Sequence, residues 1–184
     1  MTDQLRALAL LLPLALATPA VAAPLSVDLG ASVGYRHSLT LGAGGLSLGV
    51  SLAGIAGPIG VEYETLWTND HTLKVSERIA GRNDNRLNLL IVPIHRTKFR
   101  LVFGGGGSLG WVKPPGKAVG PGERTLSQGA QEFIRFDFRL DADDVGVVYG
   151  LRLGASHRWQ ADVVQAPDHA IEVALQLSFG PAVD

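Results

Sequence analysis

Apolar side chains alternate with small or polar ones every two residues along most of this chain, and this alternation limits the folds that the chain can adopt. From Leu25 to Arg36, Leu, Val, Ala and Tyr occupy one set of alternate positions, and Ser, Asp, Gly and Arg occupy the other. Successive side chains of a β-strand point to opposite faces, whereas a helix repeats every 3.6 residues. After the N-terminal segment the chain shows no helical periodicity of useful length. The pattern therefore predicts strands with one apolar and one polar face.

The same alternation recurs along the rest of the chain and predicts eight strands. Their expected bounds are 25–36, 45–55, 60–68, 86–94, 99–112, 131–140, 145–157 and 169–179. The breaks are alternately long, at 37–44, 69–85, 113–130 and 158–168, and short, at 56–58, 95–98 and 141–144. Transmembrane β-barrels have short turns on one side of the membrane and longer loops on the other. We therefore predict an antiparallel up-and-down barrel.

The segment 72–80 could form a ninth strand. An odd number of strands would place the two chain ends on opposite sides of the membrane, and single-chain bacterial barrels keep an even number. We therefore assign 69–85 to an outer loop, with 72–80 as a possible hairpin extension above the membrane.

Alternation alone does not separate a membrane barrel from a soluble one, so the composition of the polar face decides. A strand face in water should carry Lys, Glu and Thr. Here this face is mostly Gly, Ser and Ala with interspersed Arg and carboxylates, and all Lys residues lie in expected loops or at a strand boundary. Small side chains suit a narrow lumen. The polar face is therefore predicted to point inward and the apolar face to point to lipid.

Aromatic residues gather near the two ends of the expected strands. Tyr35, Trp67, Trp111 and Trp159 lie near the outer ends of the first, third, fifth and seventh strands, while Phe99, Phe138 and Phe179 lie near the opposite rim. Membrane barrels carry aromatic belts at both interfaces. The placement of these residues agrees with a transmembrane orientation.

The N-terminal segment has the features of a secretory signal peptide. Arg6 precedes an apolar stretch over 7–17, and Ala20-Val21-Ala22 supplies small residues before a cleavage site. We expect residues 1–22 to be removed and residues 23–184 to form the barrel domain. The absence of Cys from the sequence fits an exported fold that needs no disulfide.

The chain resembles the small eight-stranded outer-membrane β-barrels of the opacity-protein and OmpA type. The resemblance rests on the leader, on LGASVGYR, GVEYE and RLNLLIVPIHRTKFRLVFGGGGSLGW, and on the final strand IEVALQLSF, although five residues follow its terminal Phe179. It implies an antiparallel barrel, an outer-membrane location and a final strand read by the barrel-assembly machinery. Such barrels include structural proteins, adhesins and lipid-modifying enzymes, so the resemblance implies no single activity.

The inward face is expected to carry five acids and five bases. Because unpaired charges in a confined interior are costly, we expect these side chains to form a structural charge network that closes the lumen. Within it, Arg152 and Glu172 should belong to one network at similar depth. The ten residues are Asp28, Arg36, Glu62, Glu64, Arg100, Arg135, Asp137, Arg139, Arg152 and Glu172.

Other candidate sites are weaker. Ser38 beside His37, and Ser156 beside His157, could pair a nucleophile with a base, but Ser156 and His157 are adjacent in a strand and face opposite sides. His71, His95 and His169 fall in separate connections without metal-ligand spacing. Gly104–Gly107 lacks the Lys-Ser/Thr of a phosphate loop, and 82–85 lacks the Gly and the terminal carboxylate of a calcium loop. We expect no catalytic residues, metal or cofactor.

The composition excludes several classes of function. No Cys is present, which excludes a disulfide scaffold and a cysteine-ligated zinc site, and the net charge of −1 argues against a nucleic-acid binder.

The expected function is that of a non-enzymatic integral outer-membrane barrel with a closed lumen and exposed loops. Its expected partners are outer-membrane lipid, the barrel-assembly machinery and an unidentified ligand of the loops. A lipid A-modifying enzyme and a narrow channel remain alternatives.

Overall fold

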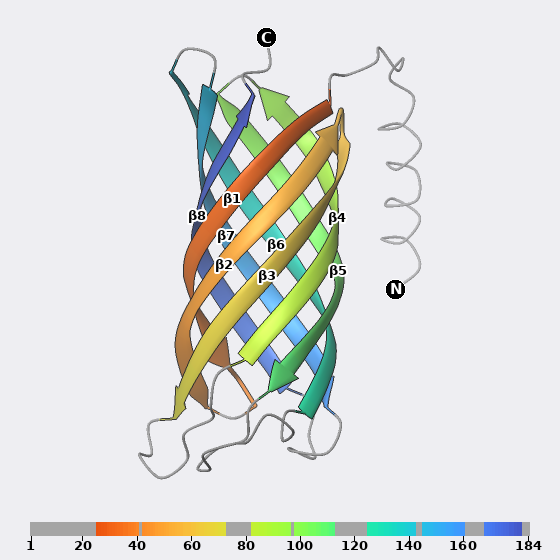
Figure 1. Cartoon of the computed structure of the whole chain (residues 1–184), viewed down its shortest axis with the longest axis vertical. Helices are drawn as coiled ribbons and strands as arrows, with labels where there is room; N and C mark the ends of the chain where they lie inside the picture. Colours follow the sequence, from red (N-terminus) through yellow and green to blue (C-terminus); the bar gives the residue numbers. More distant parts are fainter. Residues whose placement is uncertain are drawn as a thin grey trace, which may run out of the picture.

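The strands form a closed antiparallel barrel in a computed structural model that describes residues 25–40, 42–72, 82–96, 98–112, 125–142, 145–160 and 168–181 (Figure 1). Each strand pairs with the next in sequence, and β8 closes the barrel against β1. The strands are β1 (Leu25–Ser38), β2 (Ala43–Ala56), β3 (Ile59–Thr72), β4 (Arg82–Arg96), β5 (Phe99–Val112), β6 (Thr125–Ala142), β7 (Val145–Gln160) and β8 (Asp168–Pro181). The described ranges contain no helix long and apolar enough to cross a membrane.

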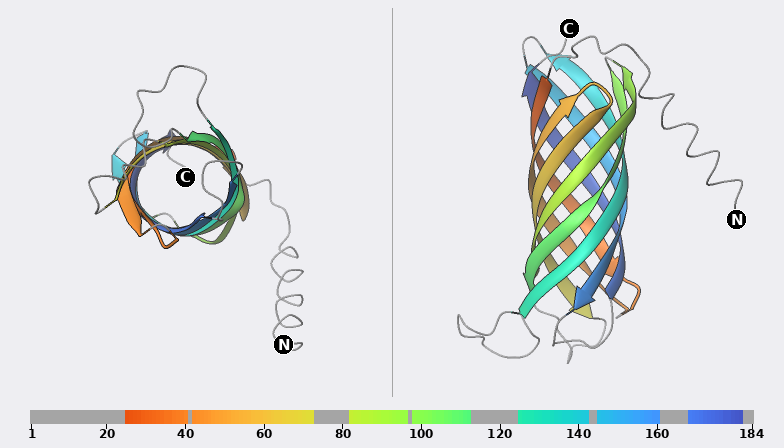
Figure 2. Two further views of the ribbon diagram at one scale, coloured as in Figure 1. Left: turned by 90° about the horizontal axis from the view of Figure 1, so that it is seen from below. Right: turned by 90° about the vertical axis from the view of Figure 1, so that its right-hand side faces the viewer.

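The strands are strongly tilted and form one ring around the barrel axis, along which the left view of Figure 2 looks. Leu25 at the start of β1 and Pro181 at the end of β8 lie at the same end of the barrel, which is the upper end in Figure 1. The tight turn between β2 and β3 is also at this end, where Gly57 has a φ of 59° that suits glycine. We call this the turn end and the opposite end the loop end.

The predicted number of strands and their antiparallel order are confirmed, but several strands are longer than the sequence pattern indicated. β3 continues to Thr72, β4 begins at Arg82 and β6 begins at Thr125, so the expected loops at 69–85 and 113–130 are partly strand. His71, His95 and His169 also lie in strands and not in connections. Backbone hydrogen bonds to neighbouring strands continue the ladder beyond the last apolar outward residue. The apolar alternation therefore predicts strands that are too short.

Two sequence predictions concern parts of the chain outside the described residues. One is the signal peptide at 1–22, and the other is the part of the possible strand 72–80 that follows Thr72. Both stay predictions.

The barrel is apolar outside and charged inside, as the alternation predicted. Leu89 on the outward face is 61% exposed, whereas Arg36 and Glu62 on the inward face are 0% exposed. A soluble barrel would have the opposite polarity, because a large exposed apolar surface is unfavourable in water. This polarity is that of a transmembrane barrel.

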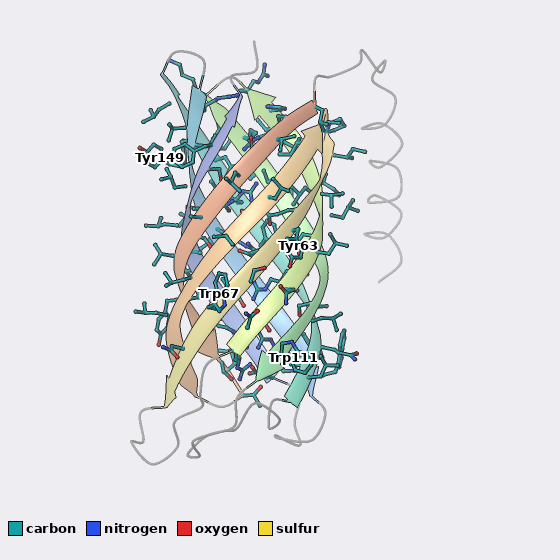
Figure 3. All side chains as sticks on the ribbon, in the orientation of Figure 1. Tyr63, Trp67, Trp111 and Tyr149 are labelled. Atoms are coloured by element: carbon teal, nitrogen blue, oxygen red, sulfur yellow. The ribbon has the colours of Figure 1, made fainter. Side chains whose placement is uncertain are left out.

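Aromatic side chains on the outward face lie toward both ends of the barrel (Figure 3). Trp67 and Trp111 lie toward the loop end, and Tyr149 lies toward the turn end. Near the turn end, the rings of Phe99 and Phe138 pack with their centroids 5.4 Å apart. The arrangement agrees with the two predicted aromatic belts.

Part of the lumen is apolar, whereas the sequence interpretation expected an interior of small residues and interspersed charges. Inward side chains in the half nearer the turn end form a buried cluster, here called the apolar layer. It consists of Ala53, Ile55, Leu90, Val92, Val102 and Phe133. These side chains lie beside inward charged groups, because Ala53 is opposite Asp28 in the β1–β2 register and Val102 is opposite Arg135 in the β5–β6 register.

Candidate functional site: the lumenal charge network

The charged side chains of the lumen are brought together because each lies on the inward parity of its strand. They form ion pairs in three groups along the barrel axis, which together are called the lumenal charge network. Most are almost fully buried, so each charge needs a partner close by to offset its loss of hydration.

The central group joins β3 to β6 and β7. Arg152 Nη1 lies 2.9 Å from both carboxylate oxygens of Glu64, and Arg135 donates a hydrogen bond to Glu62. Arg135 and Arg152 are directly opposite each other in the β6–β7 register. The two glutamates therefore offset two guanidinium groups that would otherwise repel each other.

The group at the loop end contains more bases than acids. Arg86 donates two hydrogen bonds of 2.7 Å to the two carboxylate oxygens of Glu172, a bidentate pair. Asp168 accepts hydrogen bonds from Arg36 at 2.6 Å and from Arg82 at 2.8 Å. In the same region Arg158 donates to Asp84. Arg36 Nε also lies 3.5 Å from Glu172.

The group at the turn end is smaller. Arg100 Nη2 lies 2.7 Å from Asp28 and 3.1 Å from Asp137, and Arg135 Nε lies 2.9 Å from Asp137. Because Arg135 also contacts Glu62, this group is continuous with the central one.

Several of these pairs connect strands on opposite sides of the barrel. The pair Arg152–Glu64 joins β7 to β3, Arg86–Glu172 joins β4 to β8, and Arg100–Asp28 joins β5 to β1. In a closed barrel of eight strands, partners four strands apart face each other across the axis. The side chains therefore cross the lumen and do not merely line its wall.

The ten residues expected on the inward face all point into the lumen, and each of them has an interaction partner. Arg139 is half-buried, and its guanidinium lies so close to Gly146 that a Cβ there would be 2.3 Å from Nη2. Arg152 and Glu172 are not direct partners. They are linked through Glu64 and Arg86, because Arg86 Nη1 lies 3.5 Å from Glu64.

Sequence reasoning missed five charged members of the network. One is the first residue of an expected strand, and continuing the alternation by one to four residues would have found the other four. The missed residues are Arg82, Asp84, Arg86, Arg158 and Asp168.

Phe133 is an aromatic residue on the inward face that the sequence interpretation also missed. Arg152 stacks on its ring, with Cζ 3.8 Å from the ring centroid. Space for the ring exists because residue 104 is Gly, where a Cβ would lie 2.1 Å from Phe133 Cζ. Gly104, which lies within β5, thus permits the close packing of this ring.

The serine–histidine candidates do not form catalytic pairs. Ser38 and Ser156 face the lumen, where they donate hydrogen bonds to Asp168 at 2.5 Å and to Glu172 at 3.1 Å. His157 faces outward and contacts His169, with the two Nδ1 atoms 2.9 Å apart. Within the described ranges, no group of three or more His, Asp or Glu side chains could hold a metal ion.

Comparison with solved structures identifies small outer-membrane barrels. Neisserial surface protein A matches with a TM-score of 0.55 and 11% sequence identity, covering 86% of this chain and 96% of that chain. OprG from Pseudomonas aeruginosa has a TM-score of 0.49 and 12% identity over 87% of this chain and 96% of its own. Ail, the attachment invasion locus protein of Yersinia pestis, has a TM-score of 0.48 and 12% identity over 85% and 96%.

No family model matches the sequence, and no curated protein matches it significantly. At such low identity the likeness to Neisserial surface protein A concerns the fold. The chain has the closed eight-stranded antiparallel fold of the small outer-membrane β-barrels.

Proposed function

We propose that this chain is a non-enzymatic integral protein of the outer membrane, with a closed lumen and with its loop end exposed outside the cell. The observation that carries the proposal is the polarity of the barrel, whose exposed face is apolar and whose buried face is charged. Only a surrounding hydrocarbon phase makes that polarity favourable. The shared fold with Neisserial surface protein A supports the outer-membrane location.

A closed lumen is supported by the side chains that cross it. An eight-stranded barrel is only wide enough for its own side chains. Here ion pairs such as Arg152–Glu64 and Arg86–Glu172 cross the axis, and the apolar layer lies nearer the turn end. This arrangement favours a structural role in the envelope, or a role in surface interactions through the loops, over a channel.

Export and assembly would follow the usual route for such barrels. Residues 1–22 would act as a cleaved signal peptide, and the final strand with Phe179 would be read by the barrel-assembly machinery. The outward position of Phe179 near the end of β8 supports this role.

The lipid-modifying alternative loses its candidate nucleophiles. Ser38 and Ser156 both face the lumen and are engaged by carboxylates, so neither hydroxyl is presented to lipid. An assay of extracted lipid A from cells that express the chain should find the same acylation with and without it. Loss of an acyl chain that depends on Ser156 or His157 would overturn the non-enzymatic proposal.

The location and closure can be tested with the full chain. After cell fractionation we expect it in the outer membrane, and on gels the unheated form should migrate differently from the heated form, as folded barrels do. In planar bilayers the purified barrel should give no steady ion conductance. Recovery in the soluble fraction would overturn the location, and stable conductance steps would overturn the closed lumen.

A further inference from the structure

The outward wall over β5–β8 is hollowed, although the rest of that face carries large apolar side chains. Two adjoining hollows, of about 390 and 650 Å³, share the lining residues Glu132, Ala155 and Ile171. Together they form one depression, here called the wall groove. It runs from His157 and His169 near the loop end to Phe103 and Ile134 farther toward the turn end.

Small outward residues around Glu132 create the wall groove. In the strand register Glu132 lies opposite Gly105 on β5 and opposite Ala155 on β7. Two residues toward the loop end, Ala130 lies opposite Gly107. Toward the turn end the outward side chains are large again. The groove therefore has a floor of small residues around Glu132 and an apolar part nearer the turn end.

Glu132 is an unusual residue for this face. Its side chain is exposed on the outward parity, between Ala130 and Ile134. Among the described residues, none forms a hydrogen bond or an ion pair with its carboxylate. Ionisable groups that face lipid are unfavourable, so their presence points to a function. A carboxylate can accept hydrogen bonds from the donors of a bound molecule.

The loop end of the groove is polar. His157 and His169 are directly opposite each other in the β7–β8 register, and their Nδ1 atoms are 2.9 Å apart. The His157 ring also packs edge-on against Trp159, with centroids 5.2 Å apart. Since Trp marks the membrane–water interface, the histidines lie at the depth of lipid head groups and Glu132 lies one step deeper.

We propose that the wall groove binds one acyl chain of an outer-leaflet glycolipid, and that Glu132 accepts a hydrogen bond from an amide N–H or a hydroxyl near the polar end of that chain. The proposal rests on the outer-membrane placement proposed above. The apolar part of the groove would take the hydrocarbon, and the histidine pair would face the sugar or phosphate. An ester-linked phospholipid has no donor at the depth of Glu132, so the class favoured is an acylated amino sugar.

Native mass spectrometry of the detergent-purified full chain tests this proposal, with lipid A and phosphatidylcholine as the two probes. Phosphatidylcholine has hydrocarbon chains but no N–H or O–H donor. We expect the barrel to retain lipid A about tenfold better than phosphatidylcholine, as one charge-assisted hydrogen bond would provide. Equal retention of the two lipids by the folded barrel would overturn the proposal.

Two pairs of variants locate the binding. Ala155→Leu fills the groove floor and should abolish the preferential retention, whereas Ala31→Leu, an outward alanine of β1 outside the groove, should leave it unchanged. Glu132→Gln keeps an acceptor and should retain the preference, and Glu132→Leu should remove it. Identical behaviour of the two alanine variants, or an unchanged preference in Glu132→Leu, would overturn the assignment.

The failure of this proposal is distinguishable from failure of the proposed function. Heat-modifiable mobility reports whether each variant is a folded barrel, and fractionation reports the location. A folded barrel in the outer membrane without lipid A preference would leave the proposed function standing and remove the lipid site.

Discussion

Arg152 of β7 reaches across the lumen to Glu64 of β3, and its Nη1 atom lies 2.9 Å from each carboxylate oxygen. The same guanidinium stacks on Phe133 of β6. One side chain therefore links strands on opposite sides of the barrel and also contacts the apolar layer. The pair should contribute to holding the barrel closed, and its coupling can be measured directly.

Removing either partner of this pair should destabilise the barrel strongly. Arg152→Met or Glu64→Gln leaves a buried charge without its nearest partner, which costs up to about 3–5 kcal/mol. The double variant should recover part of that loss, with a coupling energy of about 1–3 kcal/mol. Urea unfolding in lipid vesicles, followed by tryptophan fluorescence, measures each free energy.

A matched control combines Arg152→Met with Asp28→Asn, because the partner of Asp28 is Arg100. Its coupling energy should stay within about 0.5 kcal/mol of zero, as for residues that share no partner. Equal coupling energies in both pairs would mean that the total charge of the lumen, and not specific contacts, affects the stability of the barrel.

The packing of Phe133 predicts opposite outcomes for two glycines of β5. A Cβ at Gly104 would lie 2.1 Å from the Phe133 ring, whereas a Cβ at Gly107 would meet only a backbone oxygen at 3.9 Å. Gly104→Ala should therefore destabilise the barrel by about 1–3 kcal/mol through overpacking, and Gly107→Ala should be neutral or slightly stabilising. Adding Phe133→Leu should relieve part of the Gly104→Ala defect. The same unfolding assay applies, and equal effects of the two alanines would contradict the packing.

Leu89 and Leu90 are neighbours in β4 with opposite surroundings. Leu89 is 61% exposed on the outward face, and Leu90 is 0% exposed in the apolar layer. Leu90→Ala should cost about 2–5 kcal/mol because it leaves a cavity. Leu89→Ala should cost less, since lipid can fill the space. Unfolding in vesicles would reveal the reverse order if the faces were assigned wrongly.

The free-energy cost of placing a charge on the outward face should depend on how deep the residue lies in the membrane. Leu151 lies on the outward face in the interior of β7, and Leu39 lies just past the end of β1 at the loop end. Leu151→Arg should cost about 2–4 kcal/mol, and Leu39→Arg about 0–1 kcal/mol. The yield of heat-modifiable folded barrel and its unfolding free energy measure both. A similar loss at the two positions would place Leu151 outside the hydrocarbon region.

The class of fold and the face to which each side chain belongs could be predicted from the sequence. The alternation at Leu25–Arg36 and in later segments is a local property of extended backbone, so it can be followed one strand at a time. The small inward residues separated a membrane barrel from a soluble one. All ten inward charges, including Asp28 and Glu172, could be assigned to the lumen on this basis.

Which charges meet and where the strands end depends on contacts between strands that are distant in the sequence. Arg152 contacts Glu64 and not Glu172 because the relative register of distant strands sets which side chains face each other across the axis. Arg82 and Asp168 belong to strands because neighbouring backbones complete their ladders. The wall groove likewise depends on small residues from adjacent strands. Such relationships arise from long-range pairing, which the periodicity within one strand does not encode.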